Sequence, residues 1–127
     1  MRVWIIDDQE YMRTRTLPKI IRDRWPDADI TAFDSLATAI YYTGSVDLVI
    51  IDITAVCPIH RAALAFGPIC QLLERHPGAI LIINSALPRY LTDGVKESVL
   101  EYVPDAQVHS CGFPFDKNLP KVLAAIG

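Results

Sequence analysis

Three aspartates stand directly after two of the most apolar segments of the sequence. Asp7 and Asp8 follow residues 3–6 (VWII), and Asp52 follows residues 48–51 (LVII). If these segments are neighbouring strands, three carboxylates converge on one spot, where they cannot all stay ionised unless a cation compensates them. Such oxygen ligands suit Mg²⁺. Each aspartate alone is better explained as a helix cap or turn residue, but together they favour a cation site.

Five short apolar segments could position these side chains. The predicted strands are 2–7, 29–33, 47–52, 79–84 and 107–111. Three of them carry consecutive β-branched or aliphatic residues without the alternation of a half-exposed strand. Both faces of these strands should therefore be buried, as in a parallel sheet covered by helices.

Helical patterns separate the strands. Met12, Leu17, Ile20 and Ile21 form an apolar stripe in the first helix, which Pro18 should kink or delay. Ser35 is expected to cap a short second helix that runs to about residue 42. The other predicted helices are 62–73, one within 88–102 with a break at residues 93–94, and 116–126, with Pro120 near its first turn.

Five strand–helix units in 127 residues predict one α/β domain over residues 1–127, an open doubly wound sheet. The sequence alone leaves the strand order open. Ligands of such sheets bind beyond the carboxyl ends of the strands. The fourth strand ends there in Asn84 and Ser85, and the fifth leads to Gly112, Phe113 and Pro114.

The ordered set of strand ends resembles the receiver domains of response regulators in two-component signalling. The resemblance rests on residues 5–8 (IIDD), 47–52 (DLVIID), 83–86 (INSA) and 114–116 (PFD), and it spans the whole chain. It implies a single-domain, flavodoxin-like (βα)5 fold, a five-stranded parallel sheet with strand order 2-1-3-4-5.

The resemblance also implies a role for each site residue. Asp52 would accept a phosphoryl group from a histidine kinase, a phosphotransfer protein or a small phosphodonor. Asp7 and Asp8 would hold Mg²⁺, together with Asp52 and the backbone carbonyl of Thr54. Ser85 would hydrogen-bond a phosphoryl oxygen and draw the following loop inward. Phosphoryl transfer depends mainly on positioning and charge neutralisation, which agrees with these roles.

The sequence departs from the receiver pattern at the positions that report phosphorylation. Phe113 replaces the lysine that the family places before the proline after strand five, and Lys117 is a poor substitute because it follows that proline. Ser110 replaces the aromatic switch residue. The loop after Asp52 is also rebuilt, with proline at position 58 rather than 56.

Two functions therefore stay open. The first is an atypical receiver, phosphorylated on Asp52 with Mg²⁺ and altered in its switching. The second is a pseudo-receiver, a protein-interaction module that works without phosphorylation. In either case the resemblance points to a downstream protein partner on the fourth helix, fifth strand and fifth helix, and it counts a homodimer among the candidate assemblies. A small hydrolytic enzyme with a metal site lacks an evident substrate pocket, so we expect no enzyme.

Composition and charge exclude several further classes of function. The formal net charge is −3, from 12 basic and 15 acidic residues, so we expect no direct nucleic-acid partner. The arginines of the first helix, at positions 13, 15, 22 and 24, are interpreted as a solvated helix face. No apolar run is long enough for a membrane helix, and the domain is expected to be soluble and cytoplasmic.

Overall fold

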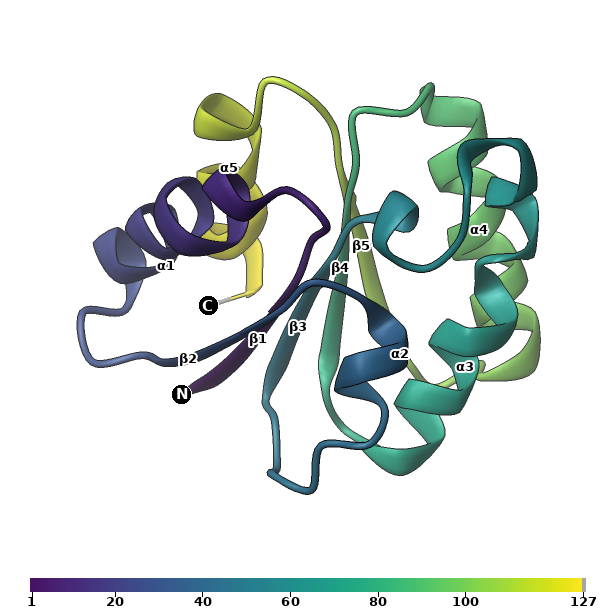
Figure 1. Cartoon of the computed structure of the whole chain (residues 1–127), viewed down its shortest axis with the longest axis horizontal. Helices are drawn as coiled ribbons and strands as arrows, with labels where there is room; N and C mark the ends of the chain where they lie inside the picture. Colours follow the sequence, from purple (N-terminus) through teal and green to yellow (C-terminus); the bar gives the residue numbers. More distant parts are fainter. Residues whose placement is uncertain (127) are drawn as a thin grey trace.

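The computed structural model describes residues 1–126 and contains a five-stranded parallel sheet in the order β2-β1-β3-β4-β5 (Figure 1). This order confirms the doubly wound fold that was expected. The strands are β1 Arg2–Ile6, β2 Asp29–Phe33, β3 Leu48–Ile51, β4 Ile80–Asn84 and β5 Gln107–Cys111. Each lies within one residue at either end of its predicted range.

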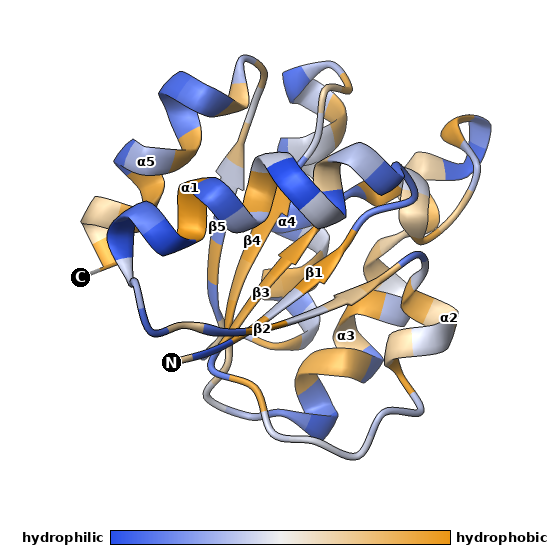
Figure 2. Ribbon diagram, turned by 60° about the vertical axis from the view of Figure 1, so that its left-hand side comes forward, coloured by the Kyte–Doolittle hydropathy of each residue, from blue (hydrophilic) through white to orange (hydrophobic). Residues whose placement is uncertain are grey.

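Helices cover both faces of the sheet (Figure 1). One face carries α1 and α5, which pack beside each other, and the other carries α2, α3 and α4. The helices are α1 Leu17–Arg24, α2 Leu36–Ala39, α3 Phe66–Arg75, α4 Arg89–Tyr102 and α5 Phe115–Ile126. Figure 2 shows the apolar strands between these two layers of helices.

The central strands are buried on both faces, as their unbroken apolar runs predict. All four residues of β3 are buried, and their side chains alternate between two core clusters. Val49 and Ile51 pack toward α2 and α3, whereas Leu48 and Ile50 pack toward α1 and α5. This alternation also decides which face the polar residues beyond the strand ends occupy.

Two helix starts follow their predicted signals. A π-helical turn at Met12–Thr16 runs directly into α1, and Pro18 lies where the backbone changes from the π-helical to the α-helical pattern. The Ser35 hydroxyl accepts a hydrogen bond from the Thr38 N–H at 3.2 Å, which confirms the N-cap of α2.

Other helix boundaries were predicted wrongly. Helix α2 ends at Ala39, so the predicted extension to residue 42 is wrong. Residues 62–64 belong to a 3-10 segment, Ile59–Leu64, and α3 begins only at Phe66. Helix α4 continues through Gly94 without a break, because Thr92, Val95 and Val99 anchor that side of the helix in buried positions. Tertiary packing here overrides the weak helix propensity of glycine.

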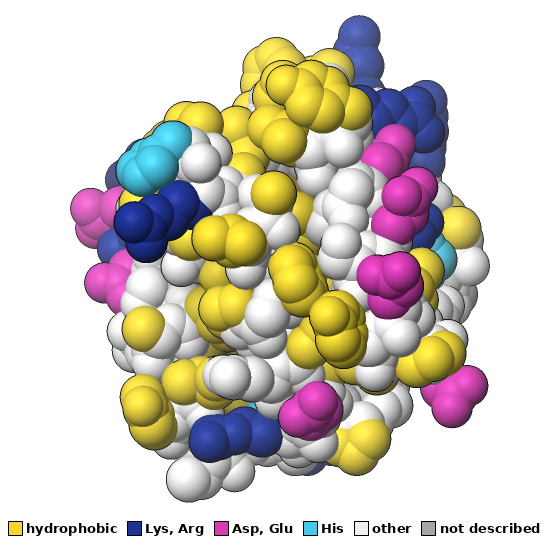
Figure 3. Space-filling view, turned by 90° about the vertical axis from the view of Figure 1, so that its right-hand side faces the viewer, with side chains coloured by type: hydrophobic (Ala, Val, Ile, Leu, Met, Phe, Trp, Pro, Cys, Tyr) yellow, Lys and Arg dark blue, Asp and Glu magenta, His cyan; other side chains and the backbone are white. Residues whose placement is uncertain are grey.

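The face formed by α3 and α4 carries scattered apolar side chains among charged ones (Figure 3). Ile59, Leu64, Tyr90 and Tyr102 are exposed large hydrophobic residues, and the ring of Tyr102 stacks on Phe66. Within residues 1–126, none of the helices is both long and apolar enough to span a membrane.

Candidate functional site

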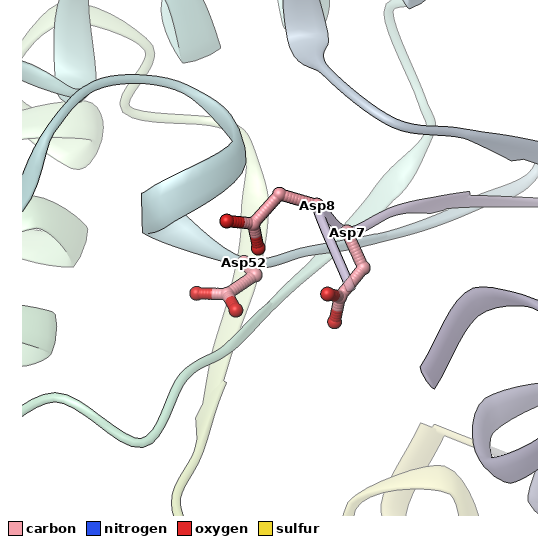
Figure 4. Close-up of side chains that lie close together, drawn as sticks. All are labelled: Asp7, Asp8 and Asp52. Atoms are coloured by element: carbon pink, nitrogen blue, oxygen red, sulfur yellow. The ribbon is translucent and has the colours of Figure 1, made fainter. Parts of the chain in front are cut away.

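Strand register brings the three aspartates together at the carboxyl edge of the sheet. Ile6 of β1 pairs with Ile51 of β3, so Asp7 and Asp52 follow at equivalent positions on adjacent strands. The Asp52 N–H donates to the Ile6 carbonyl at 2.9 Å, which extends the pairing by one bond. Oxygen atoms of Asp7, Asp8 and Asp52 all lie within 4.8 Å of one another (Figure 4). The predicted carboxylate cluster is therefore present.

Local hydrogen bonds hold each carboxylate in place. The Gln9 N–H donates to Asp7 Oδ1 at 2.9 Å. The Thr54 N–H donates to Asp52 Oδ1 at 3.2 Å, and the Thr54 hydroxyl donates to Asp8 Oδ1 at 3.1 Å. Asp52 thereby caps the 3-10 turn Ile53–Ala55. Thr54 links two of the three aspartates, Asp52 through its backbone N–H and Asp8 through its hydroxyl, a role that the sequence did not reveal.

Burial and crowding make the cluster electrostatically unfavourable without a cation. Asp7 is 2% exposed, and burial raises the pKa of its carboxyl to about 6, with the Asp52 and Asp8 charges adding to the effect of burial. Burial likewise raises the pKa of Asp52, against hydrogen bonds from Thr54 and the Ser85 hydroxyl that lower it. A bound cation would favour the ionised form of every carboxylate in the cluster.

The donor set fits a hard divalent cation. Three carboxylates lie close enough together to bind one ion. Because Asp8 is exposed, this leaves room for the waters that Mg²⁺ retains. Asp7, Asp8 and Asp52 are the side chains that could hold it. The role of the Thr54 carbonyl as a fourth ligand stays a prediction.

Ser85 occupies the site from the adjacent strand end. It directly follows β4, is 1% exposed, and its hydroxyl accepts a hydrogen bond from the Leu87 N–H at 3.2 Å. That bond ties the Ser85 side chain to the start of the loop between β4 and α4. The contact of Ser85 with a phosphoryl oxygen, which the resemblance implies, stays a prediction.

Arg13 contributes a cation that the sequence interpretation missed. Its guanidinium donates to the backbone carbonyls of Asp7 and Asp8 at 3.4 and 3.3 Å, and its charge lowers the pKa of the Asp7 carboxyl. Arg15, Arg22 and Arg24 are exposed, as a solvated helix face requires, but Arg13 is half-buried. The signal lay in its spacing, five residues after Asp8, which lets a long side chain fold back from the π-helical turn.

Ser110 and Phe113, which depart from the expected pattern, lie within β5 and just after it. Phe113 follows β5, is 73% exposed, and packs edge-to-face on Phe115 with ring centroids 5.7 Å apart. Lys117 is an exposed residue in the first turns of α5. Ser110 lies within β5, and its hydroxyl contacts Asp93 of α4 at 3.4 Å. Neither Phe113 nor Ser110 can therefore supply the positive charge or the aromatic ring of the pattern.

Comparisons with known proteins find similarity to this chain at the level of the fold. No protein-family model and no curated protein sequence matches the chain. The structure of response regulator DrrB, an OmpR/PhoB homologue from Thermotoga maritima, is similar at TM-score 0.61 and 18% identity, over 98% of this chain and 49% of DrrB. The chain has the response regulator receiver fold.

Two further structures carry the same fold. The BeF3-activated DrrB receiver domain aligns with TM-score 0.61 and 16% identity, over 98% of this chain and 92% of that domain. A response regulator from Burkholderia pseudomallei, with a phosphorylated aspartic acid, a calcium ion and citrate, aligns with TM-score 0.65 and 14% identity, over 99% of this chain and 66% of its own. The chain thus spans about half of DrrB and nearly all of the DrrB receiver domain.

Proposed function

We propose that this chain is a receiver domain that accepts a phosphoryl group on Asp52 in a two-component phosphorelay. The carboxylate cluster of Asp7, Asp8 and Asp52 carries this proposal, because it joins a candidate cation site to a nucleophile at the carboxyl edge of a receiver fold. The phosphorylated aspartic acid and calcium ion of the Burkholderia pseudomallei regulator support it by analogy.

Each residue of the site has its own role in the phosphoryl transfer. Asp7, Asp8, Asp52 and the Thr54 carbonyl would hold Mg²⁺, which supplies positive charge against an anionic donor. The Thr54 N–H holds Oδ1 of Asp52 and so orients its carboxylate. A carboxylate oxygen of Asp52 attacks phosphorus, the bond from phosphorus to the donor's imidazole nitrogen breaks, and its electron pair returns to that nitrogen. The group is transferred to the domain itself, so the chain is proposed as an acceptor rather than an enzyme.

We propose a histidine kinase or a phosphotransfer protein as the phosphodonor, and a cytoplasmic domain that contacts neither membrane nor nucleic acid directly. A downstream protein would bind across α4, β5 and α5. A cavity of about 530 Å³ between these elements supports that surface, and its lining includes Arg89, Ser110, Phe113 and Lys121. A homodimer through the same elements is the other candidate assembly.

Phosphorylation by acetyl phosphate tests the proposal. The protein is incubated with acetyl phosphate and Mg²⁺, and the intact mass is recorded. We expect one added phosphoryl group that disappears in Asp52→Asn and without Mg²⁺. Asp105→Asn, the same substitution in the exposed loop before β5, should leave the modification intact. No added mass on the unchanged protein, or equal mass on Asp52→Asn, would overturn the proposal.

A pseudo-receiver is the second candidate function. It is favoured by the exposed Phe113 in place of a cation and by Ser110 in place of an aromatic switch. In this case Mg²⁺ and a phosphoryl mimic would leave the backbone amide signals of Ser85 and α4 unchanged in NMR spectra. Shifts at those amides would instead support phosphorylation-dependent switching.

A further inference from the structure

Asn84 is a buried polar residue whose side chain is unpaired within the part of the chain that the structure describes. It is the last residue of β4 and is 1% exposed. Neither its amide nitrogen nor its amide oxygen has a hydrogen-bond partner among residues 1–126. Buried polar atoms in proteins are nearly always hydrogen-bonded, so an amide left in this state needs an explanation.

Strand register places Asn84 beside the phosphoacceptor. Ile83 of β4 pairs with Ile51 of β3, so Asn84 stands next to Asp52 at the following position of the two parallel strands. Asp52 in turn stands beside Asp7. The carboxyl edge of the sheet therefore carries Asp7, Asp52 and Asn84 in a row on three adjacent strands.

The three side chains also share one face of the sheet. Ile5, Ile50 and Ile82 all belong to the core cluster that packs against α1 and α5. Side chains alternate along a strand, so the residues two positions later, which are Asp7, Asp52 and Asn84, point to the same face. Cys111, which pairs with Asn84 across β4 and β5, belongs to that cluster as well.

We propose that Asn84 is a phosphoryl-binding residue whose amide N–H donates to an oxygen of the group carried by Asp52. This inference rests on the proposed function and adds a donor that the acidic cluster lacks. Phe113 follows β5, on the far side of β4 from Asp52. Its exposed side chain is uncharged, so it supplies no positive charge there. The Asn84 amide is on β4, one strand closer to Asp52 than Phe113 is.

A purely structural role for Asn84 makes the opposite prediction. A leucine or valine would fill a similar buried volume without an unsatisfied amide, so a fold-stabilising residue at this position would be apolar. The strand run of residues 80–83 (ILII) is apolar up to this point. The polar exception is therefore explained by a ligand rather than by the fold.

Beryllofluoride binding tests the inference, since it is the ligand of the activated DrrB receiver domain. Its affinity is measured at saturating Mg²⁺ for the unchanged protein, Asn84→Leu and Asn84→Val. We expect both variants to unfold at the same temperature as the unchanged protein or higher in metal-free buffer, and to bind beryllofluoride roughly 10- to 100-fold more weakly, as expected for a lost hydrogen bond to a charged group. Thr92→Val, which removes a buried hydroxyl of α4, should leave the affinity unchanged.

The outcomes separate the two proposals. If the unchanged protein does not bind beryllofluoride, the proposed function fails and this inference with it. If the unchanged protein binds and both Asn84 variants bind equally well, only the role of Asn84 is overturned. Should both variants fail to fold, the side-chain amide signals of Asn84 are followed by NMR in the unchanged protein. A shift on adding beryllofluoride supports the contact, and no shift overturns it.

Discussion

Replacing Asp7 by asparagine should stabilise the metal-free protein at neutral pH. The substitution keeps the side-chain oxygen that accepts the Gln9 N–H but removes the buried negative charge. The pKa of Asp7 lies at about 6 in the folded protein against an ordinary 3.8, and one pKa unit corresponds to about 1.36 kcal/mol. Keeping Asp7 ionised therefore costs the folded state about 3 kcal/mol at pH 7, and Asp7→Asn should recover most of that free energy of unfolding.

The sign of the effect fixes its pH dependence. Because folding raises the pKa of Asp7, the stability linked to its protonated form is fully present below about pH 3.8 and is lost as the pH rises through about 6. The two proteins should therefore have nearly equal free energies of unfolding at pH 3.5 and should differ by about 3 kcal/mol at pH 7.

Urea unfolding in EDTA and in saturating Mg²⁺ provides the assay. With Mg²⁺ the order should reverse, because binding to the folded state stabilises the unchanged protein and the asparagine variant has lost a ligand. Asp105→Asn is the matched control and should change the free energy of unfolding by less than about 0.5 kcal/mol. If Asp7→Asn destabilises the metal-free protein at pH 7, the reasoning from buried, crowded charge is refuted.

Three further substitutions test other parts of the account. Arg13→Gln should raise the pKa of Asp7, measured from its side-chain carbon signal over a pH titration, because the guanidinium lowers that pKa; an unmoved titration would contradict the contact. Phe113→Lys should strengthen binding of beryllofluoride at little cost in stability, because the position is exposed, and an unchanged affinity would mean that the rebuilt loop after Asp52 limits the response. Ser35→Ala should lower the free energy of unfolding by about 1 kcal/mol through loss of the α2 cap, and denaturant unfolding that shows no loss would contradict the role of the cap.

Much of the fold was predictable because the strongest signals were local. The run before Asp52 is apolar at every position, and the structure buries all four of its residues in β3. The helix boundaries were less predictable because they depend on contacts distant in sequence. Gly94 suggested a break, yet Thr92, Val95 and Val99 are buried on the same helix and keep α4 continuous.

The part of the site formed by residues that directly follow the strands was predictable from the sequence. Asp7, Asp8 and Asp52 lie together because parallel strands end at the same edge of the sheet. Arg13 was assigned to a solvated helix face, because its helical spacing cannot show that its guanidinium returns to the carbonyls of the aspartates.

Asn84 illustrates a further limit. Its position at a strand end was visible in the sequence, but its lack of a hydrogen-bond partner among residues 1–126 depends on the packing of the folded chain. Register and burial were both needed before it could be related to Asp52.

Calorimetric titration of the protein with Mg²⁺ is the sharpest test of the proposed site, since every proposed role depends on the cluster of Asp7, Asp8 and Asp52. We expect saturable binding of one Mg²⁺ ion per chain, accompanied by proton release near pH 6 because Asp7 is then partly protonated. Binding should be lost in Asp8→Asn and retained in Asp105→Asn. An absence of saturable binding, or equal binding by Asp8→Asn, would contradict the claim that these carboxylates form a cation site.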